Sequence, residues 1–301
     1  MTIDERTLGT IGLDGRATLE LNARGEGQAL LVECLPGEML EVWSRARSVV
    51  PTTGAWPVLL AAWTSGGTWA EAFSNSEPFS DFYFHEQAPP AEAGPAALVA
   101  KASRLDLEAW RTTAESREAY WRDNLDDLVQ YQRDVTLKLI GSAPEMDELM
   151  TVARNAAAPS TALERFLFDW EDAIAATTPD LRYQDWFDPS GIVPVALAFL
   201  PTPRPWEVFA YVHSLYGVDQ VPMIAAARSW HESFGAEPVA LWGTMVQFLV
   251  ARPPMDRELR WRTAIFHDLL GPDTLARPGV TVREHARALS VLDRWFLHAR
   301  P

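Results

Sequence analysis

The chain has 301 residues, which fits one large domain or two of ordinary size, and 48% of them are hydrophobic, enough for a substantial core. Its formal net charge is −15, from 26 basic and 41 acidic side chains. This charge disfavours nucleic acid and anionic membranes as partners, because both would be repelled, and favours a basic protein. The plainer interpretation is that the charge keeps the protein soluble.

The N-terminus and the single cysteine predict a cytoplasmic protein. Residues 1–7 have neither the basic start nor the apolar stretch of a signal peptide. The longest apolar stretches, 57–63 and 192–200, are far shorter than the ~20 residues that span a bilayer. Cys34 cannot form an internal disulfide, which fits a reducing compartment, and its apolar surroundings predict a core residue.

The N-terminal third predicts strands and a helix. Glycines punctuate short apolar runs within 7–35, the pattern of a β-hairpin. Residues 38–49 place apolar side chains on one helix face, and 56–63 form a continuous apolar run, typical of a strand buried on both faces. Strand, helix and strand at this spacing predict a βαβ unit with a parallel pair. Residues 64–100 are predicted to be irregular.

Helical periodicity dominates the middle of the chain. Residues 101–140 predict one or two helices, and another is expected over 144–157. A further helix is predicted from Thr161, because Thr161 and Glu164 have the spacing of a capping box. These helices together predict a helical insertion over 101–190.

Mixed structure returns in the last third. The elements predicted there are strands at 192–200, 238–241 and 245–250 and helices at 205–214, 222–235, 255–270 and 282–297. The whole pattern predicts an α+β protein with a mixed β-sheet flanked by helices. Because neither end supplies enough strands for a sheet of its own, residues 1–100 and 191–301 are expected to share one sheet and form one composite domain with the insertion.

Thirteen tryptophans are spread along the chain. Most are expected in the core, because large rings dominate core burial. An aromatic binding surface is the alternative, since tryptophan is favoured at interfaces. The tryptophans expected to be buried, each on an apolar strand or helix stripe, are Trp56, Trp63, Trp170, Trp230 and Trp295.

The common catalytic motifs are absent from the sequence. It contains no P-loop, no Gly-x-Ser-x-Gly elbow, no His-Glu-x-x-His and no Cys-x-x-Cys. The glycine-rich residues 9–15 lead into a predicted strand rather than a helix, so they favour a hairpin turn over a dinucleotide site. The six histidines are widely separated. We therefore predict no cofactor and no metal site.

Short motifs follow one another in the last third of the chain. They are Val195-Ala196-Leu197-Ala198-Phe199-Leu200-Pro201-Thr202-Pro203, Pro205-Trp206-Glu207, Trp230, Phe234-Gly235-Ala236-Glu237, Pro253-Pro254, Ala264, Pro272-Asp273 and Trp295-Phe296. In order and spacing, over residues 192–298, they resemble the bacterial family called domain of unknown function 4253. Trp43 and residues 53–60 resemble the N-terminal part of its longer members. The family has no established activity, so the resemblance implies no function.

Several polar positions typical of that family are replaced in this chain. Members usually carry Trp-Asn-x-Cys-Pro where this chain has residues 218–222, and an Asp and a Glu where it has Thr244 and Gln247. The usual Phe-Cys-Pro-Asp becomes residues 270–273, and the usual closing Trp-Trp-Asp is missing after Phe296. If the family has a polar site, much of it is missing here.

We predict no catalytic residue, but five residues near the family-like turns form a candidate pocket: Trp206, Glu207, Asp219, His267 and Asp273. Two hypotheses follow. The first is a protein-interaction module, of an immunity-like kind, that binds a basic partner. The second is a small-molecule enzyme, such as a hydrolase, that uses the Glu, Asp and His side chains. A deep pocket that gathers them would favour the enzyme, and a flat acidic patch with exposed tryptophan would favour the module.

Overall fold

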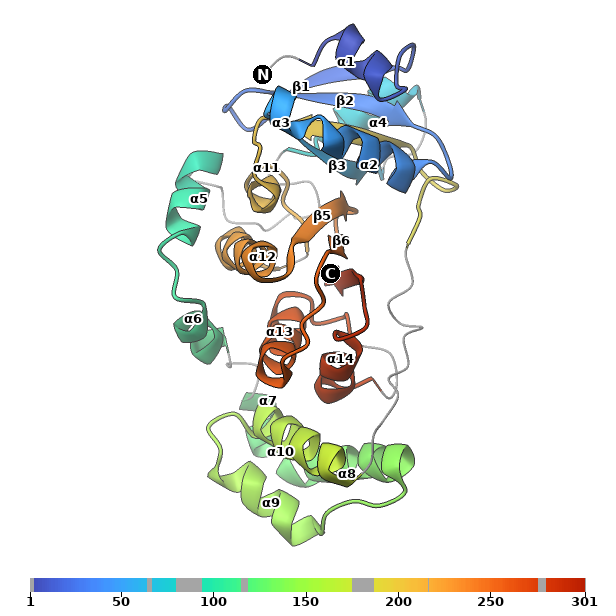
Figure 1. Cartoon of the computed structure of the whole chain (residues 1–301). Helices are drawn as coiled ribbons and strands as arrows, with labels where there is room; N and C mark the ends of the chain where they lie inside the picture. Colours follow the sequence, from blue (N-terminus) through green and yellow to red (C-terminus); the bar gives the residue numbers. More distant parts are fainter. Residues whose placement is uncertain are drawn as a thin grey trace. The chain divides into compact units, whose positions relative to one another are not determined.

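The computed structural model describes residues 3–63, 67–79, 94–114, 119–174, 187–215, 217–275 and 280–300 (Figure 1). Contacts within the chain divide it into two compact units. The first unit consists of Met1–Leu105, Gln184–Arg252 and Asp293–Pro301, and the second of Asp106–Tyr183 and Pro253–Leu292. That both belong to one composite domain stays a prediction.

The first unit contains a seven-stranded sheet with the order β1-β2-β4-β3-β5-β6-β7. Its strands are β1 (Thr18–Asn22), β2 (Gln28–Cys34), β3 (Trp56–Ala61), β4 (Val195–Leu200), β5 (Ala236–Leu241), β6 (Met245–Val250) and β7 (Arg294–His298). Neighbouring strands are antiparallel except β3 and β5, which run parallel. The α+β prediction with a mixed sheet is confirmed, and strands from both ends of the chain share this sheet.

The two central strands explain the continuous apolar runs of the sequence. Every residue of β3 and β4 is buried, as expected for strands covered on both faces. The predicted βαβ unit is confirmed in part: β2, α2 and β3 form in that order, and the two strands run in the same direction because each is antiparallel to β4. They do not pair with each other, because β4 lies between them. The parallel partner of β3 is β5, a strand from the last third of the chain.

The first unit also contains helices, of which α2 packs against β3 and α12 against β5. They are α1 (Glu5–Thr10), α2 (Met39–Ser48), α3 (Val50–Thr53), α4 (Trp69–Ser76), α5 (Pro95–Ala102), η3 (Pro205–Glu207), α11 (Val208–Tyr211) and α12 (Gln220–Phe234). The prediction of irregular structure over 64–100 is wrong for α4 and α5, while 64–66 and 80–93 lie outside the described residues. Thr68 and Glu71 form a capping box for α4, and Pro95 occupies the first turn of α5.

The second unit is helical where the structure describes it, which confirms the predicted helical middle region. Its helices are α6 (Leu107–Ala114), α7 (Ala119–Asp123), α8 (Leu125–Ile140), α9 (Met146–Asn155), α10 (Pro159–Ile174), α13 (Arg257–Leu270) and α14 (Val282–Ala288). The apolar faces of α8, α9 and α10 form a core of their own, made of Leu128, Val129, Leu149, Ala153, Leu163 and Leu167.

The end of the chain differs from its prediction. The helix expected over 282–297 stops at Ala288, and β7 follows. Trp295 and Leu297 point into the core while their neighbours are more exposed, a period-2 pattern that fits a strand. Pairing with β6 thus overrides the helical interpretation of this segment.

Three of the five tryptophans expected in the core are buried there. Trp56, Trp230 and Trp295 are 1%, 3% and 0% exposed, and the rings of Trp230 and Trp295 meet edge to face at 5.9 Å. The prediction is wrong for Trp63, which is 37% exposed because it lies beyond the end of β3. Trp170 is half-buried.

Cys34 lies in the core, as predicted. Burial raises the pKa of its thiol to about 12, with the nearby charge of Glu38 acting in the same direction. The thiolate is therefore scarce at neutral pH, which suits a packing residue rather than a nucleophile.

Candidate functional site

A pocket of about 640 Å³ in the first unit is lined by residues of α5 and α12. These two helices pack against each other and are labelled in Figure 1. Both helices contribute walls, and the segment from Pro201 to Tyr211 completes the lining. Its charged and aromatic lining residues are Glu26, Arg204, Trp206, Glu207, Tyr211, Arg228 and Glu232. The volume falls within the range of about 300–1,000 Å³ that is typical of ligand sites.

Glu207 is a buried carboxylate of this lining. The prolines after β4 end the strand, and Pro205 opens the short helix η3 that carries Glu207. The side chain is 8% exposed, accepts a 2.5 Å hydrogen bond from the Thr202 hydroxyl and lies 2.7 Å from the Arg204 guanidinium. One oxygen therefore has a hydrogen-bond partner and the other an ion-pair partner.

Glu26 joins the β1–β2 hairpin to the start of α5. Arg24 and Gly25 have positive φ angles there, which turns the chain sharply. Both carboxylate oxygens of Glu26 accept from the Ala96 backbone N–H, at 3.0 and 2.9 Å. A side chain on Gly94 would meet Glu26 at 2.5 Å, so glycine allows this close approach. Glu26 thus caps the helix that forms one wall of the pocket.

The α12 wall combines an apolar surface with a charged pair. Ile224 and Ala225 line the pocket, and the next turn places Arg228 and Glu232 four residues apart. Their side chains form a 2.7 Å ion pair and are about half exposed, at 46% and 54%. This pair therefore contributes little stability and leaves both charges accessible to solvent.

Two aromatic side chains complete the lining. The partly exposed Trp206 ring packs on the His231 ring with centroids 5.2 Å apart. The Tyr211 hydroxyl donates to the Pro201 carbonyl at 3.4 Å. Burial raises the pKa of Tyr211 to about 12, and the negative charges of Glu26 and Glu207 act in the same direction, so the phenol is neutral at physiological pH.

Trp206 and Glu207 are the two predicted site residues that line this pocket. Asp219 lies outside the lining and is exposed. It is the N-cap of α12, where its carboxylate accepts the Val221 backbone N–H at 2.9 Å. This contact gives Asp219 a structural role in holding the start of the α12 wall.

Replacing Asp219 with alanine should lower the free energy of unfolding of the first unit by about 1 kcal/mol, because an N-cap hydrogen bond is lost. Asparagine can make the same bond and should restore most of the stability. Chemical denaturation followed by tryptophan fluorescence measures both. A functional role for Asp219 would emerge instead if the asparagine variant kept wild-type stability and lost biological effect.

His267 and Asp273 belong to the second unit. His267 is fully buried, and its Nδ1 lies 2.9 Å from Nε2 of His285. Burial lowers the pKa of both imidazoles, that of His285 to about 3, so both are neutral at physiological pH. Asp273 is partly exposed near the end of α13. That these five residues form one site stays a prediction.

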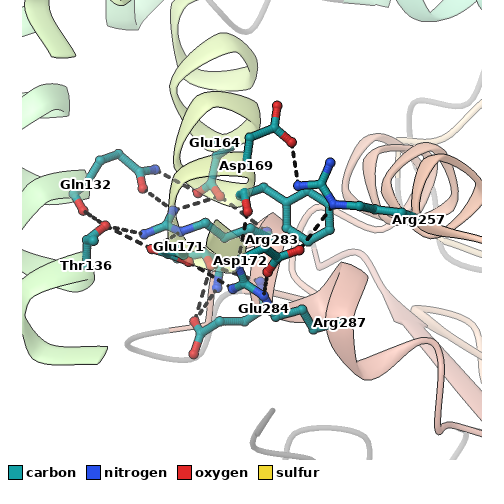
Figure 2. Close-up of polar contacts among 12 residues, drawn as sticks. Gln132, Thr136, Glu164, Asp169, Glu171, Asp172, Arg257, Arg283, Glu284 and Arg287 are labelled. Atoms are coloured by element: carbon teal, nitrogen blue, oxygen red, sulfur yellow. Dashed lines mark hydrogen bonds and ion pairs between the residues drawn. The ribbon is translucent and has the colours of Figure 1, made fainter. Parts of the chain in front are cut away.

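A buried network of charges joins α8, α10 and α14 in the second unit (Figure 2). Arg283 is fully buried on α14. Its Nε donates to Glu171 at 2.8 Å, and one terminal nitrogen donates to Glu164 at 2.8 Å and to Gln132 at 2.6 Å. The other terminal nitrogen donates to the Thr136 hydroxyl at 3.1 Å. All three guanidinium nitrogens therefore have partners.

A second arginine on α14 extends the network. Arg287 donates to the remaining oxygen of Glu171 at 2.9 Å and to Asp172 at 2.8 Å. Arg257, on α13, reaches the other oxygen of Asp172 at 3.2 Å (Figure 2). Because these charges compensate one another and α14 is anchored through them, we interpret the network as structural rather than as a ligand site.

The site residues that the sequence did not single out are Glu26, Arg204, Tyr211, Arg228 and Glu232. The i, i+4 spacing of Arg228 and Glu232 predicts an ion pair on a helix, though not a pocket. Glu26 carries no such signal, since it reaches the pocket only through the packing of α5.

Among the described residues, no group of three His, Cys, Asp or Glu side chains is arranged to hold a metal ion. None of the described helices has the length and apolar character needed to cross a membrane.

The fold and pocket define an α+β chain with a ligand-sized cavity beside a mixed sheet. Residues 196–298 match the family described as domain of unknown function (DUF4253), which agrees with the resemblance in the last third of the sequence. The matched range runs from β4 to β7 and includes most of the pocket lining, while Glu26 and α5 lie outside it. No curated protein and no solved structure matches the chain.

Proposed function

We propose that the protein is an interaction module that binds a segment of a partner protein in the pocket between α5 and α12. The observation that carries the proposal is the pocket itself, where the partly exposed Trp206 lies among charged side chains. A tryptophan within a concave polar rim is a common anchor of protein interfaces. The net charge of −15 favours a basic partner, because it accelerates encounter with positive surfaces.

The placement of the acid and base candidates supports binding over turnover. The enzyme hypothesis needs Glu207, Asp219, His267 and Asp273 to converge on a substrate, and of these only Glu207 lines the pocket. Its two oxygens are engaged by Thr202 and Arg204. A general acid or base must reach the proton that it transfers, and this carboxylate is held by other partners. An immunity-like role, in which the module neutralises a harmful basic protein, fits this proposal and its charge.

The test starts from capture of partners from the native host with the tagged protein, followed by mass spectrometry and binding measurements on the purified partner. Replacing Trp206 with alanine should weaken binding by more than about fivefold, the loss expected for an interface anchor. The matched control is Tyr131→Ala, which removes an aromatic ring that is 48% exposed in the second unit. The control should bind like the wild type, and the association rate should fall as salt rises.

Two results would refute the proposal. One is a partner that binds the Trp206→Ala variant as tightly as the wild type while the fold is unchanged. The other is a substrate that the wild type converts, with conversion lost in a folded variant that replaces Glu207, Asp219, His267 and Asp273 together.

A further inference from the structure

The charged side chains that line the pocket form two ion pairs and leave one carboxylate over. Arg204 and Glu207 form one ion pair and Arg228 and Glu232 another, each at 2.7 Å. This pairing leaves Glu26, whose carboxylate accepts hydrogen bonds only from the Ala96 backbone N–H among the described residues. A carboxylate offers about four acceptor positions, so an exposed Glu26 keeps capacity for a charged donor.

We infer that the pocket accepts a basic side chain, a lysine or arginine of the partner segment, with its cationic group on Glu26 and its aliphatic stem along α5 and α12. This inference rests on the proposed function, since it names the chemistry of the segment that the pocket holds. The stem would lie on Val99, Ala100, Ile224 and Ala225, the apolar lining of the two helices. Lysine and arginine suit such a site, because each joins a long apolar stem to a charged head.

The field around Tyr211 supports a cation over an anion. The charges that raise the pKa of its hydroxyl, after burial, are those of Glu26 and then Glu207, with Arg204 acting less in the opposite direction. The local potential is therefore negative beside Glu26. An anion would instead have to bind arginines that are already engaged by carboxylates.

Capped tripeptides that differ only in the central residue test the inference. The probes carry lysine, arginine, norleucine or glutamate, and the readout is the NMR signal of the Trp206 indole, assigned by its loss in Trp206→Phe. The lysine or arginine peptide should shift this signal with a Kd on the order of 1 mM, and the norleucine and glutamate peptides should bind at least about fivefold more weakly.

A matched pair of variants assigns the effect to one carboxylate. Glu26→Gln should weaken the basic probe by about two- to fivefold, because one exposed charge contact is removed, and should leave the norleucine peptide unchanged. Glutamine keeps an acceptor for the Ala96 N–H, and a thermal melt checks that α5 stays in place. The control, Glu20→Gln, neutralises an exposed glutamate on β1 outside the pocket and should bind like the wild type.

The outcomes separate the inference from the proposed function. Equal binding of all peptides at Trp206, stronger binding of the glutamate peptide, or no binding of the basic probes overturns the inference. The proposed function would survive any of these if the captured partner still depends on Trp206. If spermidine binds as tightly as the peptides and its binding depends on Glu26, a free polyamine can supply the cation, and the inference that a side chain of the partner supplies it is overturned. Basic peptides that bind more tightly than spermidine and depend on Glu26 support the inference.

Discussion

Replacing Arg283 with methionine should lower the free energy of unfolding of the second unit by about 3–5 kcal/mol. Arg283 is fully buried and bound to Glu164 and Glu171, which are 4% and 0% exposed. Methionine fills a similar volume but leaves part of this negative charge uncompensated in a medium of low dielectric. The cost comes from the carboxylates left behind, more than from the net contribution of the pair.

Amide hydrogen exchange in α8, α10 and α14 measures this effect, because it reports on the second unit directly even if the two units unfold at different denaturant concentrations. The control is Arg154→Met, at an exposed position near the end of α9, which should change stability by no more than about 0.5 kcal/mol. Equal protection in both variants would contradict the structural interpretation of the network.

The position of Arg283 shows where sequence reasoning stopped. The segment from Thr281 to Glu284 predicts a capping box and a helix start, and the structure has both. An arginine in the first turn of a helix is expected in solvent, yet this one is buried by carboxylates more than 100 residues earlier in the chain. Local pattern identified the helix, but the burial depends on the tertiary partners of that position.

The sheet and the pocket likewise have parts that local sequence patterns predict and parts that depend on tertiary contacts. The buried strands β3 and β4 follow from continuous apolar runs, because such runs are typical of strands covered on both faces. Their neighbours do not follow from such runs, since β4 enters between β2 and β3 from nearly 140 residues further along the chain. In the pocket, Trp206 and Glu207 were predicted from the turn after β4, and Glu26 was not, because it lies far upstream in a hairpin.

Lowering the pH from 7 to 5 should destabilise the second unit by about 2 kcal/mol for each of the buried imidazoles of His267 and His285. In the folded state both pKa values lie below the ordinary value of 6.5, that of His285 at about 3, chiefly because burial disfavours the charged form. Unfolding returns them to about 6.5, so below that pH the unfolded state binds more protons. The stability is therefore complete above about pH 6.5 and is lost as the pH falls toward the folded pKa values.

Glu284 acts in the opposite direction, because burial raises the pKa of its carboxyl and the folded state then holds a proton that the unfolded state has released. Where Glu284 takes up this proton, its effect subtracts from that of the histidines.

Replacing His285 with glutamine separates the histidine effect from the rest. The amide can still donate to His267, and one of the two neutral imidazoles is removed, so the loss of stability between pH 7 and 5 should fall by about half. Denaturant unfolding at pH 7, 6 and 5, followed by hydrogen exchange in α13 and α14, gives the slope. His231→Gln, at a partly exposed histidine of the first unit, is the control and should keep the wild-type slope. A wild-type protein whose second unit is equally stable at pH 7 and 5 would show that the pair is not held neutral by burial.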